Sequence, residues 1–234
     1  MKKYILCFLV LSFLLTLPGK AQDASEPKTQ PNIILFFIDD MGWRDWSGNG
    51  SDYLDTPSID RIAKEGVLFE QGYVNAANCA PSRCAMLSGQ YTPRNHFYNV
   101  HSIHRGNKKT DRLSLQDVRS ESVLADERIS FGEAMKDAGY ATAMYGKWHV
   151  AGNEKLDGTR IEGGIYPAQQ GFDDVLEHNS LELIKVTAKN NDPKQIYTYT
   201  KRAIEFMEKS TAGKKPFLVY RRTNSIKRLL IFTF

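Results

Sequence analysis

Continuous apolar runs alternate with segments of helical periodicity along this 234-residue chain. Residues 32–38 form one apolar run that ends in two aspartates, which predicts a central parallel strand covered on both faces. Shorter runs predict further strands at 67–74, 141–145, 172–176 and 216–220. Because helical segments separate these strands, the pattern predicts an α/β fold with a mostly parallel central sheet and helices on both faces.

Capping and breaking residues mark the ends of the predicted helices. Between two of the helices, the stretch 96–125 is polar and irregular, with His96, His101 and His104, and it predicts a long surface excursion. The helix signals are Thr56-Pro57 and Gly66, the capping box Ser130-Phe-Gly-Glu133 followed by Gly139, and Asp192-Pro193.

The N-terminus is typical of a secretory signal peptide. Two lysines precede an apolar run at 4–17, and Gly19-Lys20-Ala21 supplies a cleavage site of the small-x-small type. The run is too short for a comfortable membrane span. We therefore expect residues 1–21 to be removed and residues 22–30 to be a disordered polar linker. The mature protein is expected in the periplasm or outside the cell, with no stable membrane anchor.

The formal net charge of +4 comes from the two ends of the chain. Residues 1–21 and 221–234 hold three and four basic residues, and neither segment contains an acid. The body between them is slightly acidic, with no basic face and no recognised nucleic-acid-binding motif. The sequence therefore predicts no nucleic-acid partner.

Residues 79–89 read Cys-Ala-Pro-Ser-Arg-Cys-Ala-Met-Leu-Ser-Gly. Pro81 fits the first turn of a helix, and Gly89 is a natural helix terminator. Cys79 then lies just before the helix N-terminus, where free N–H groups and the helix dipole favour an anion and lower a thiol pKa. Arg83 adds a permanent cation with a planar fork suited to sulfate or phosphate oxygens. The alternative interpretation is an ordinary amphipathic helix with two buried cysteines.

Cys79 and Cys84 are the cysteines that remain after signal cleavage. In an oxidising compartment the first alternative is a disulfide between them. Five residues of helix separate the two Cα atoms by roughly 7.5 Å along the axis alone, which exceeds the reach of an unstrained bridge. We therefore predict that these cysteines are not bonded to each other.

Two predicted strands are followed by charged or titratable residues, at the edge where open α/β sheets bind ligands. Asp39 and Asp40 follow the first strand and suit a hard divalent cation such as calcium, although a solvated turn or helix cap is the alternative. Lys147 and His149 follow the strand at 141–145 and could bind a sulfate oxygen and exchange protons. A surface lysine and a packed histidine are the alternative for that pair.

These pieces occur together in the order and rough spacing seen in one enzyme family. Residues 79–89 match C-x-P-S-R-x-x-[LM]-x-[ST]-G, preceded by the Asp-Asp pair and followed by Gly-Lys-Trp-His at 146–149. The chain resembles the N-terminal portion of type I, formylglycine-dependent sulfatases of the alkaline phosphatase-like superfamily. The resemblance implies a partial, C-terminally incomplete sulfatase catalytic domain at 31–220 that hydrolyses sulfate esters.

The resemblance also implies the chemistry of the site. A formylglycine-generating maturation enzyme would oxidise Cys79, and a hydroxyl of the hydrated aldehyde would attack sulfur in a sulfated small molecule or glycan. The implied roles are calcium ligation for Asp39, Asp40 and the modified Cys79, formylglycine binding for Arg83, sulfate binding for Lys147, and proton transfer for His149.

The end of the chain departs from the family pattern. The family places a Pro-His pair, further calcium ligands and another sulfate-binding lysine after the next strand, whereas residues 221–234 are basic and then apolar. This atypical tail predicts a frameshift or a truncation, the alternative being a true short protein whose tail packs. Because two carboxylates and a formylglycine fill only part of a calcium shell, we expect weak or no activity from this chain.

Two other functions compete with sulfate ester hydrolysis. The first is hydrolysis of phosphate or phosphonate monoesters by a relative in the same superfamily, since sulfate and phosphate esters differ mainly in charge. The second is a truncated, inactive sulfatase fragment that binds sulfated glycans or nothing.

Overall fold

The computed structural model describes most of the chain between Gln30 and Thr223. The chain divides into two compact units, Met1–Gln30 and Pro31–Phe234, and the described elements all belong to the second. The predicted signal peptide, linker residues 22–29 and the tail from 224 lie outside the described residues. The described residues are 30–100, 118, 120–152, 164–177, 192 and 195–223.

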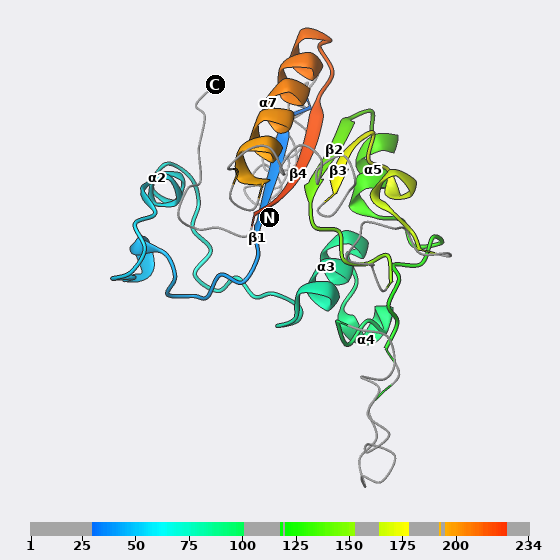
Figure 1. Ribbon diagram of the computed structural model, residues 1–234, viewed down its shortest axis with the longest axis horizontal. Helices are drawn as coiled ribbons and strands as arrows, with labels where there is room; N and C mark the ends of the chain where they lie inside the picture. Colours follow the sequence, from blue (N-terminus) through cyan, green and yellow to red (C-terminus); the bar gives the residue numbers. More distant parts are fainter. Residues whose placement is uncertain are drawn as a thin grey trace, which may run out of the picture. The chain divides into compact units, whose positions relative to one another are not determined.

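Four strands form a parallel sheet in the order β1-β4-β2-β3 (Figure 1). The predicted parallel sheet is therefore confirmed, and the last strand along the chain lies between the first and the second. The strands are β1 (Ile33–Ile38), β2 (Ala141–Gly146), β3 (Asp174–Glu177) and β4 (Phe217–Thr223).

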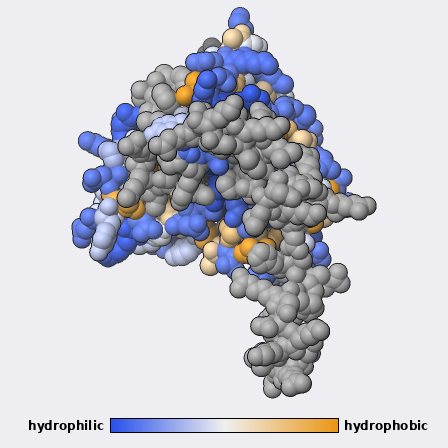
Figure 2. All heavy atoms as spheres, viewed as in Figure 1, coloured by the Kyte–Doolittle hydropathy of each residue, from blue (hydrophilic) through white to orange (hydrophobic). Residues whose placement is uncertain are grey.

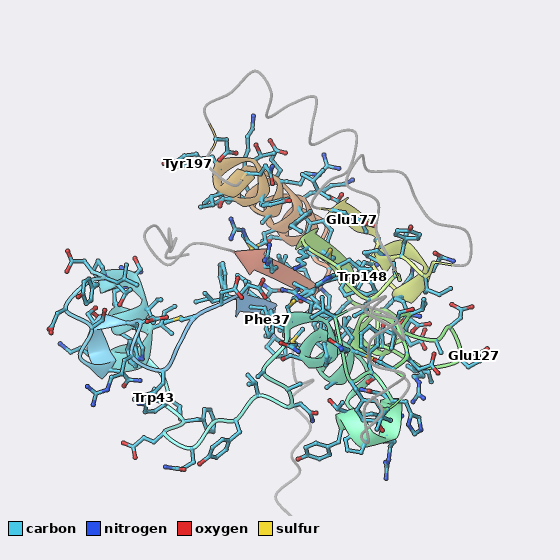
Figure 3. All side chains as sticks on the ribbon, turned by 60° about the horizontal axis from the view of Figure 1, so that its bottom comes forward. Phe37, Trp43, Glu127, Trp148, Glu177 and Tyr197 are labelled. Carbon is cyan, nitrogen blue, oxygen red and sulfur yellow. The ribbon has the colours of Figure 1, made fainter. Side chains whose placement is uncertain are left out.

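Helices cover both faces of this sheet, as predicted. Figure 3 shows α7 on one side of β4, with α3 and α5 on the other. Successive residues of one strand point to opposite faces, so Leu218 and Tyr220 join the core under α3 and α5, whereas Phe217 and Val219 pack under α7. The helices are α2 (Pro57–Glu65), α3 (Cys79–Ser88), α4 (Thr92–Asn95), α5 (Phe131–Asp137) and α7 (Ile196–Ala212), with 3₁₀ turns η1 (Ser47–Asn49) and η3 (Pro167–Gln170).

The predicted capping box holds for α5, whereas for α7 the N-cap residue is Gln195 and Asp192 only bonds to the first turn. Ser130 and Glu133 form the full capping box, with hydrogen bonds of 3.1 and 2.8 Å. The Asp192 carboxylate accepts two backbone N–H groups at the start of α7, at 3.0 and 2.8 Å. Thr56 precedes α2 but does not cap it, because its hydroxyl bonds with Ser47 instead.

Three expectations about the elements are wrong. Residues 67–74 form no strand, and Phe69 and Tyr73 are 78% and 86% exposed, because no described strand offers this segment a hydrogen-bonding partner. β1 is an edge strand among those described, and Ile34 is 41% exposed on the face where α7 packs over β4 and β2. The final strand runs to Thr223, three residues past its predicted end.

The predicted surface excursion is anchored at both ends. Phe97 and Leu124 are buried in the core, and the Leu124 N–H donates to the Val150 carbonyl at 2.8 Å. Residues 101–117, which include two of the three histidines, lie outside the described residues.

The face of the described part seen in Figure 2 is mainly polar. Hydrophilic residues cover most of the coloured atoms on the face in Figure 2, and apolar residues form small separate patches. Among the described helices, none is long and apolar enough to cross a membrane.

Candidate active site

The carboxyl ends of three strands and the start of α3 meet in one cluster. Asp39 follows β1, Lys147 and His149 follow β2, and Cys79 is the first residue of α3. Asp40 is the predicted site residue that stands apart, since its side chain is exposed and its backbone is left-handed with φ 58°. The structure therefore brings most of the predicted residues together, as expected for the ligand edge of a parallel sheet.

Cys79 lies where α3 begins, between a histidine and a lysine. Its Sγ is 3.3 Å from Nδ1 of His149 and 3.8 Å from Nζ of Lys147. The helix starts at Cys79 itself, after an extended Asn78, so the sulfur belongs to the first turn, where backbone N–H groups are free. An anionic group at this position is stabilised by the helix N-terminus and by the nearby ammonium group.

Arg83 is a rigid cation one turn along the same helix, on the side of α3 that carries Cys79. Its guanidinium is fully buried and lies over the ring of Phe37, 4.9 Å from the centroid. It donates to the Lys147 carbonyl and to Tyr220 Oη, at 2.8 and 3.0 Å. These contacts tie α3 to the ends of β1, β2 and β4 and hold the guanidinium in one orientation.

Asp39 is held between two guanidinium groups. Arg83 Nη2 donates to Oδ1 at 2.8 Å, and Arg222 Nη2 donates to Oδ2 through a close contact. Asp39 and Arg222 are only 7% and 5% exposed. Burial opposes ionisation of this carboxyl, but the two guanidinium groups outweigh it, so the pKa of Asp39 is lowered. Burial lowers the pKa of Arg222, and its bond to Asp39 offsets part of that effect.

A glycine at the end of β2 positions Lys147 and His149, which follow that strand. Gly146 has φ 119°, and a Cβ there would lie 2.9 Å from the Arg222 carbonyl oxygen. Only glycine accepts both this backbone and this close approach of β2 to β4. Trp148 then turns into the core and donates to the Ile165 carbonyl at 2.9 Å. With Trp148 anchored, its neighbours Lys147 and His149 remain at the surface of the cluster.

The arrangement does not fit the calcium site that the resemblance implies. Both carboxylate oxygens of Asp39 already accept hydrogen bonds from arginines. Among the described residues, no group of three or more His, Cys, Asp or Glu side chains could hold a metal ion. Calcium needs six to eight oxygen ligands, so Asp39 and Asp40 do not form such a site in this conformation.

Three residues of the cluster were not predicted from the sequence: Phe37, Tyr220 and Arg222. Phe37 and Tyr220 were expected only as parts of strands, and Arg222 was assigned to an atypical tail. The alternation of β4 is the signal that could have found the last two. Leu218, Tyr220 and Arg222 share one face of that strand, so extending it by two residues would have pointed Arg222 toward the site.

The two cysteines are free, which confirms that no disulfide joins them. Cys84 packs in the core, and burial raises the pKa of its thiol to about 12. Cys79 is partly exposed beside His149. Of these two thiols, only Cys79 is placed for chemistry.

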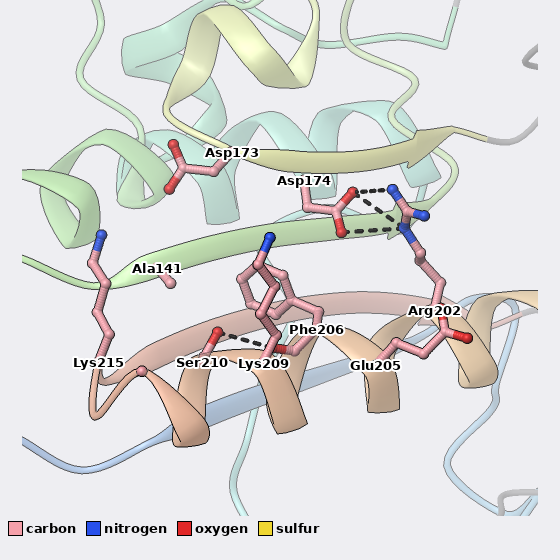
Figure 4. Close-up of a pocket in the computed structure, with 10 residues that line it drawn as sticks. Ala141, Asp173, Asp174, Arg202, Glu205, Phe206, Lys209, Ser210 and Lys215 are labelled. Atoms are coloured by element: carbon pink, nitrogen blue, oxygen red, sulfur yellow. Dashed lines mark hydrogen bonds and ion pairs between the residues drawn. The ribbon is translucent and has the colours of Figure 1, made fainter.

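A pocket lies at the end of the sheet opposite the cluster. This pocket of about 540 Å³ is lined by the first residues of β2 and β3 and by α7 (Figure 4). Arg202 donates to both oxygens of Asp174 there, and Lys136 pairs with Asp173 at 2.7 Å. Because its charges neutralise each other and it faces away from the ligand edge, we do not assign it to catalysis.

Known proteins resemble this chain over nearly all of its described part. The Sulfatase family model matches residues 31–225. A sulfatase of Formosa agariphila is 39% identical over 63% of this chain and 27% of its own length. The N-acetylgalactosamine-6-sulfatase of Mus musculus is 28% identical over 92% of this chain and 43% of its own. The chain thus spans less than half the length of these curated relatives.

Solved structures share the fold. A protein from the glycosaminoglycan locus of Bacteroides thetaiotaomicron superposes with a TM-score of 0.61 at 22% identity, over 83% of this chain and 51% of that one. Ps i-CgsB in complex with k-i-k-neocarrahexaose superposes with a TM-score of 0.59 at 24% identity, over 84% and 45%. From the matching family model and these relatives, the chain belongs to the sulfatase family, within the alkaline phosphatase-like superfamily.

Proposed function

We propose that this cluster is the active site of a sulfuric ester hydrolase. The observation that carries the proposal is the position of Cys79, which lies at a helix N-terminus within 3.3 Å of His149 and 3.8 Å of Lys147. In a chain of the sulfatase family, this is the cysteine of the C-x-P-S-R motif. A formylglycine made from it by a maturation enzyme would supply the hydroxyl that attacks sulfur and the second hydroxyl that allows sulfate to leave.

The residues around Cys79 have separate roles in this proposal. His149 Nδ1 faces the reacting side chain and holds or moves its proton. Lys147 Nζ binds a sulfate oxygen beside the same side chain. Arg83 fixes the helix start against the strand ends and contributes positive charge behind it. Calcium ligation by Asp39, Asp40 and the modified Cys79 remains a prediction of the resemblance alone.

The names of the relatives support a proposed substrate class. Several are named N-acetylgalactosamine-6-sulfatases, and one structural neighbour is a complex with its substrate D-glucosamine-2-N,6-O-disulfate. We therefore propose a sulfated glycan or a small sulfated sugar, hydrolysed in the periplasm or outside the cell after signal cleavage. Because the chain spans less than half of its relatives, the full reaction is proposed for the sulfatase domain to which this site belongs.

The first experiment compares Cys79→Ala with Cys84→Ala in protein co-expressed with a maturation enzyme. Turnover of an aryl sulfate and a sulfated disaccharide, which is expected to be weak in this chain, should vanish in Cys79→Ala, while circular dichroism stays unchanged. Cys84→Ala should keep its activity per folded molecule, because Cys84 is buried in the core and does not reach the cluster. Peptide mass spectrometry should show the aldehyde at residue 79. Full activity in Cys79→Ala would contradict the mechanism.

A phosphate or phosphonate monoesterase is the second candidate. It is favoured by the surplus of cations, since Arg83 and Arg222 both bond to the buried Asp39 carboxylate and Lys147 lies beside Cys79. A phosphate monoester carries more negative charge than a sulfate ester and would gain more from this surplus. Rates on matched aryl sulfate and aryl phosphate separate the two. Glycan binding without turnover of either would indicate the inactive fragment instead.

A further inference from the structure

Arg222 is the unexpected member of the cluster, and strand order explains its position. β4 pairs with β1 so that Arg222 lies opposite Phe37, two residues before Asp39. Its neighbour Arg221 points to the other face and donates to the Ile196 carbonyl and to Thr200 on α7. The alternation of a single strand thus sends two adjacent arginines to opposite sides of the sheet, and only Arg222 reaches the site.

The guanidinium of Arg222 is in the place where a metal would have to bind Asp39. It takes Oδ2, while Arg83 takes Oδ1, so a cation could reach this carboxylate only by displacing an arginine. A divalent ion bound to Asp39 would also lie close to the two buried guanidinium groups. The repulsion between these positive charges is strongly unfavourable away from water. Asp40 acts on Arg222 electrostatically and favours its charged form, so that carboxylate also supports the arginine.

The charge balance of the cluster is positive without any metal. Arg83 and Arg222 share the one buried carboxylate Asp39, Lys147 lies beside Cys79, and the exposed Asp40 acts on Arg222 only electrostatically. The Nε atoms of both arginines are buried and find no acceptor among the described residues. The N-terminus of α3 adds further preference for an anion beside Cys79.

We infer that Arg222 is the built-in cation of this site: its guanidinium replaces a divalent metal at Asp39, and the cluster binds a tetrahedral oxyanion without one. The inference rests on the proposed function only in taking this cluster as the active site. It does not depend on turnover or on conversion of Cys79. A purely structural Arg222–Asp39 ion pair is the alternative, and it predicts lost stability without any change in metal or anion affinity.

Calcium binding to the 234-residue chain, with Cys79 left as cysteine, tests whether Arg222 takes the place of a metal at Asp39. Calorimetry and equilibrium dialysis should show that the wild type has no calcium site at Asp39. Calcium binding should therefore be the same in the wild type and in Asp39→Asn. Arg222→Met, which keeps the length and loses the charge, should bind calcium about tenfold more tightly or better. That gain should disappear in Arg222→Met/Asp39→Asn. Arg222→Lys should behave as the wild type, and so should the matched neighbour variant Arg221→Met.

Titration with inorganic sulfate in the presence of a chelator tests whether the cluster binds a tetrahedral oxyanion without a metal. The wild type and Arg222→Lys should bind sulfate, and Arg222→Met should bind it about tenfold more weakly. Circular dichroism and thermal unfolding establish that each variant is folded. If Arg222→Met does not fold, the comparison of wild type with Asp39→Asn decides the metal question, and wild-type sulfate binding decides the anion question.

Three results would overturn the inference. They are calcium binding by the wild type that depends on Asp39, a folded Arg222→Met with unchanged calcium affinity, and no sulfate binding by the wild type without a metal. Loss of turnover on every ester would contradict the proposed function but would leave these binding results unaffected, so the two failures are distinguishable.

Discussion

The sheet and the segment from 41 to 76 differ in the solvent exposure of their apolar side chains. Met144 and Val219 in the sheet are 0% exposed, whereas Phe69 and Val67 in the segment are each 78% exposed. The segment keeps local order through polar contacts, in which Ser47 Oγ donates to Asp60 at 2.6 Å, and α2 has no buried residue.

The difference shows that apolar composition alone does not make a core. In the sheet, each strand has a hydrogen-bonded neighbour, and helices pack over β2 and β4, so the side chains of these two strands leave water together. In the segment, Val67, Leu68 and Phe69 pair with no strand among the described residues, so their side chains stay exposed. Paired substitutions in the two regions can test this contrast.

The largest effect is expected from removing charge at the buried carboxylate. Asp39→Asn leaves Arg83 and Arg222 without a counter-charge and should lower the free energy of unfolding by about 3–5 kcal/mol. The matched change in the segment, Asp60→Asn, weakens partly exposed hydrogen bonds and should cost about 0.5–1.5 kcal/mol. Urea denaturation measures both. Equal losses would contradict the contrast between the regions.

The contribution of Asp39 to the free energy of unfolding should also depend on pH. Its pKa is lower in the folded than in the unfolded protein, so its contribution is fully present above the unfolded value, about 3.9. The contribution is lost as the pH falls through the lower folded value. The stability difference between wild type and Asp39→Asn should therefore stay constant near neutral pH and shrink below about pH 4.

A second pair of variants compares burial of the same residue type. Leu218→Ala removes a side chain from the middle of β4 and should cost about 2–5 kcal/mol. Leu68→Ala removes one from the exposed segment and should change stability by no more than about 0.5 kcal/mol. A large loss from Leu68→Ala in the isolated chain would show that the segment is packed in solution.

The smallest perturbation is chemical labelling, which compares the exposure of the two cysteines of α3. Iodoacetamide should label Cys79 in the native, unconverted chain and leave Cys84 unmodified, because burial raises the pKa of Cys84 to about 12. Peptide mapping after native and denatured labelling distinguishes the two sites. Rapid native labelling of Cys84 would mean that the core under α3 opens readily.

Local signals predicted the local structure around the site. The start of α3 near Cys79, its end at Gly89 and the capping box at Ser130 were all predicted from short patterns. The absence of a Cys79–Cys84 disulfide also followed from helix geometry. These features depend on residues within one or two turns of each other, so neighbouring sequence is enough to set them.

The contacts of Arg222 could not be predicted in the same way. Its partner Asp39 is 183 residues away, and the two meet only because β4 lies between β1 and β2. The same strand order makes β1 an edge among the described strands. The exposure of residues 67–74 likewise reflects the lack of a partner among those residues, which no pattern inside the segment could reveal.

The sequence by itself determined the family, the sheet type, and the residues that carry the proposed chemistry: Cys79, Arg83, Lys147 and His149. Only the tertiary structure decided which charges surround Asp39, and so whether calcium ligands are free. The physical reason is range. Caps, periodicity and motifs act through local backbone geometry, whereas the electrostatics of a buried carboxylate depend on whichever distant side chains the strand order brings against it.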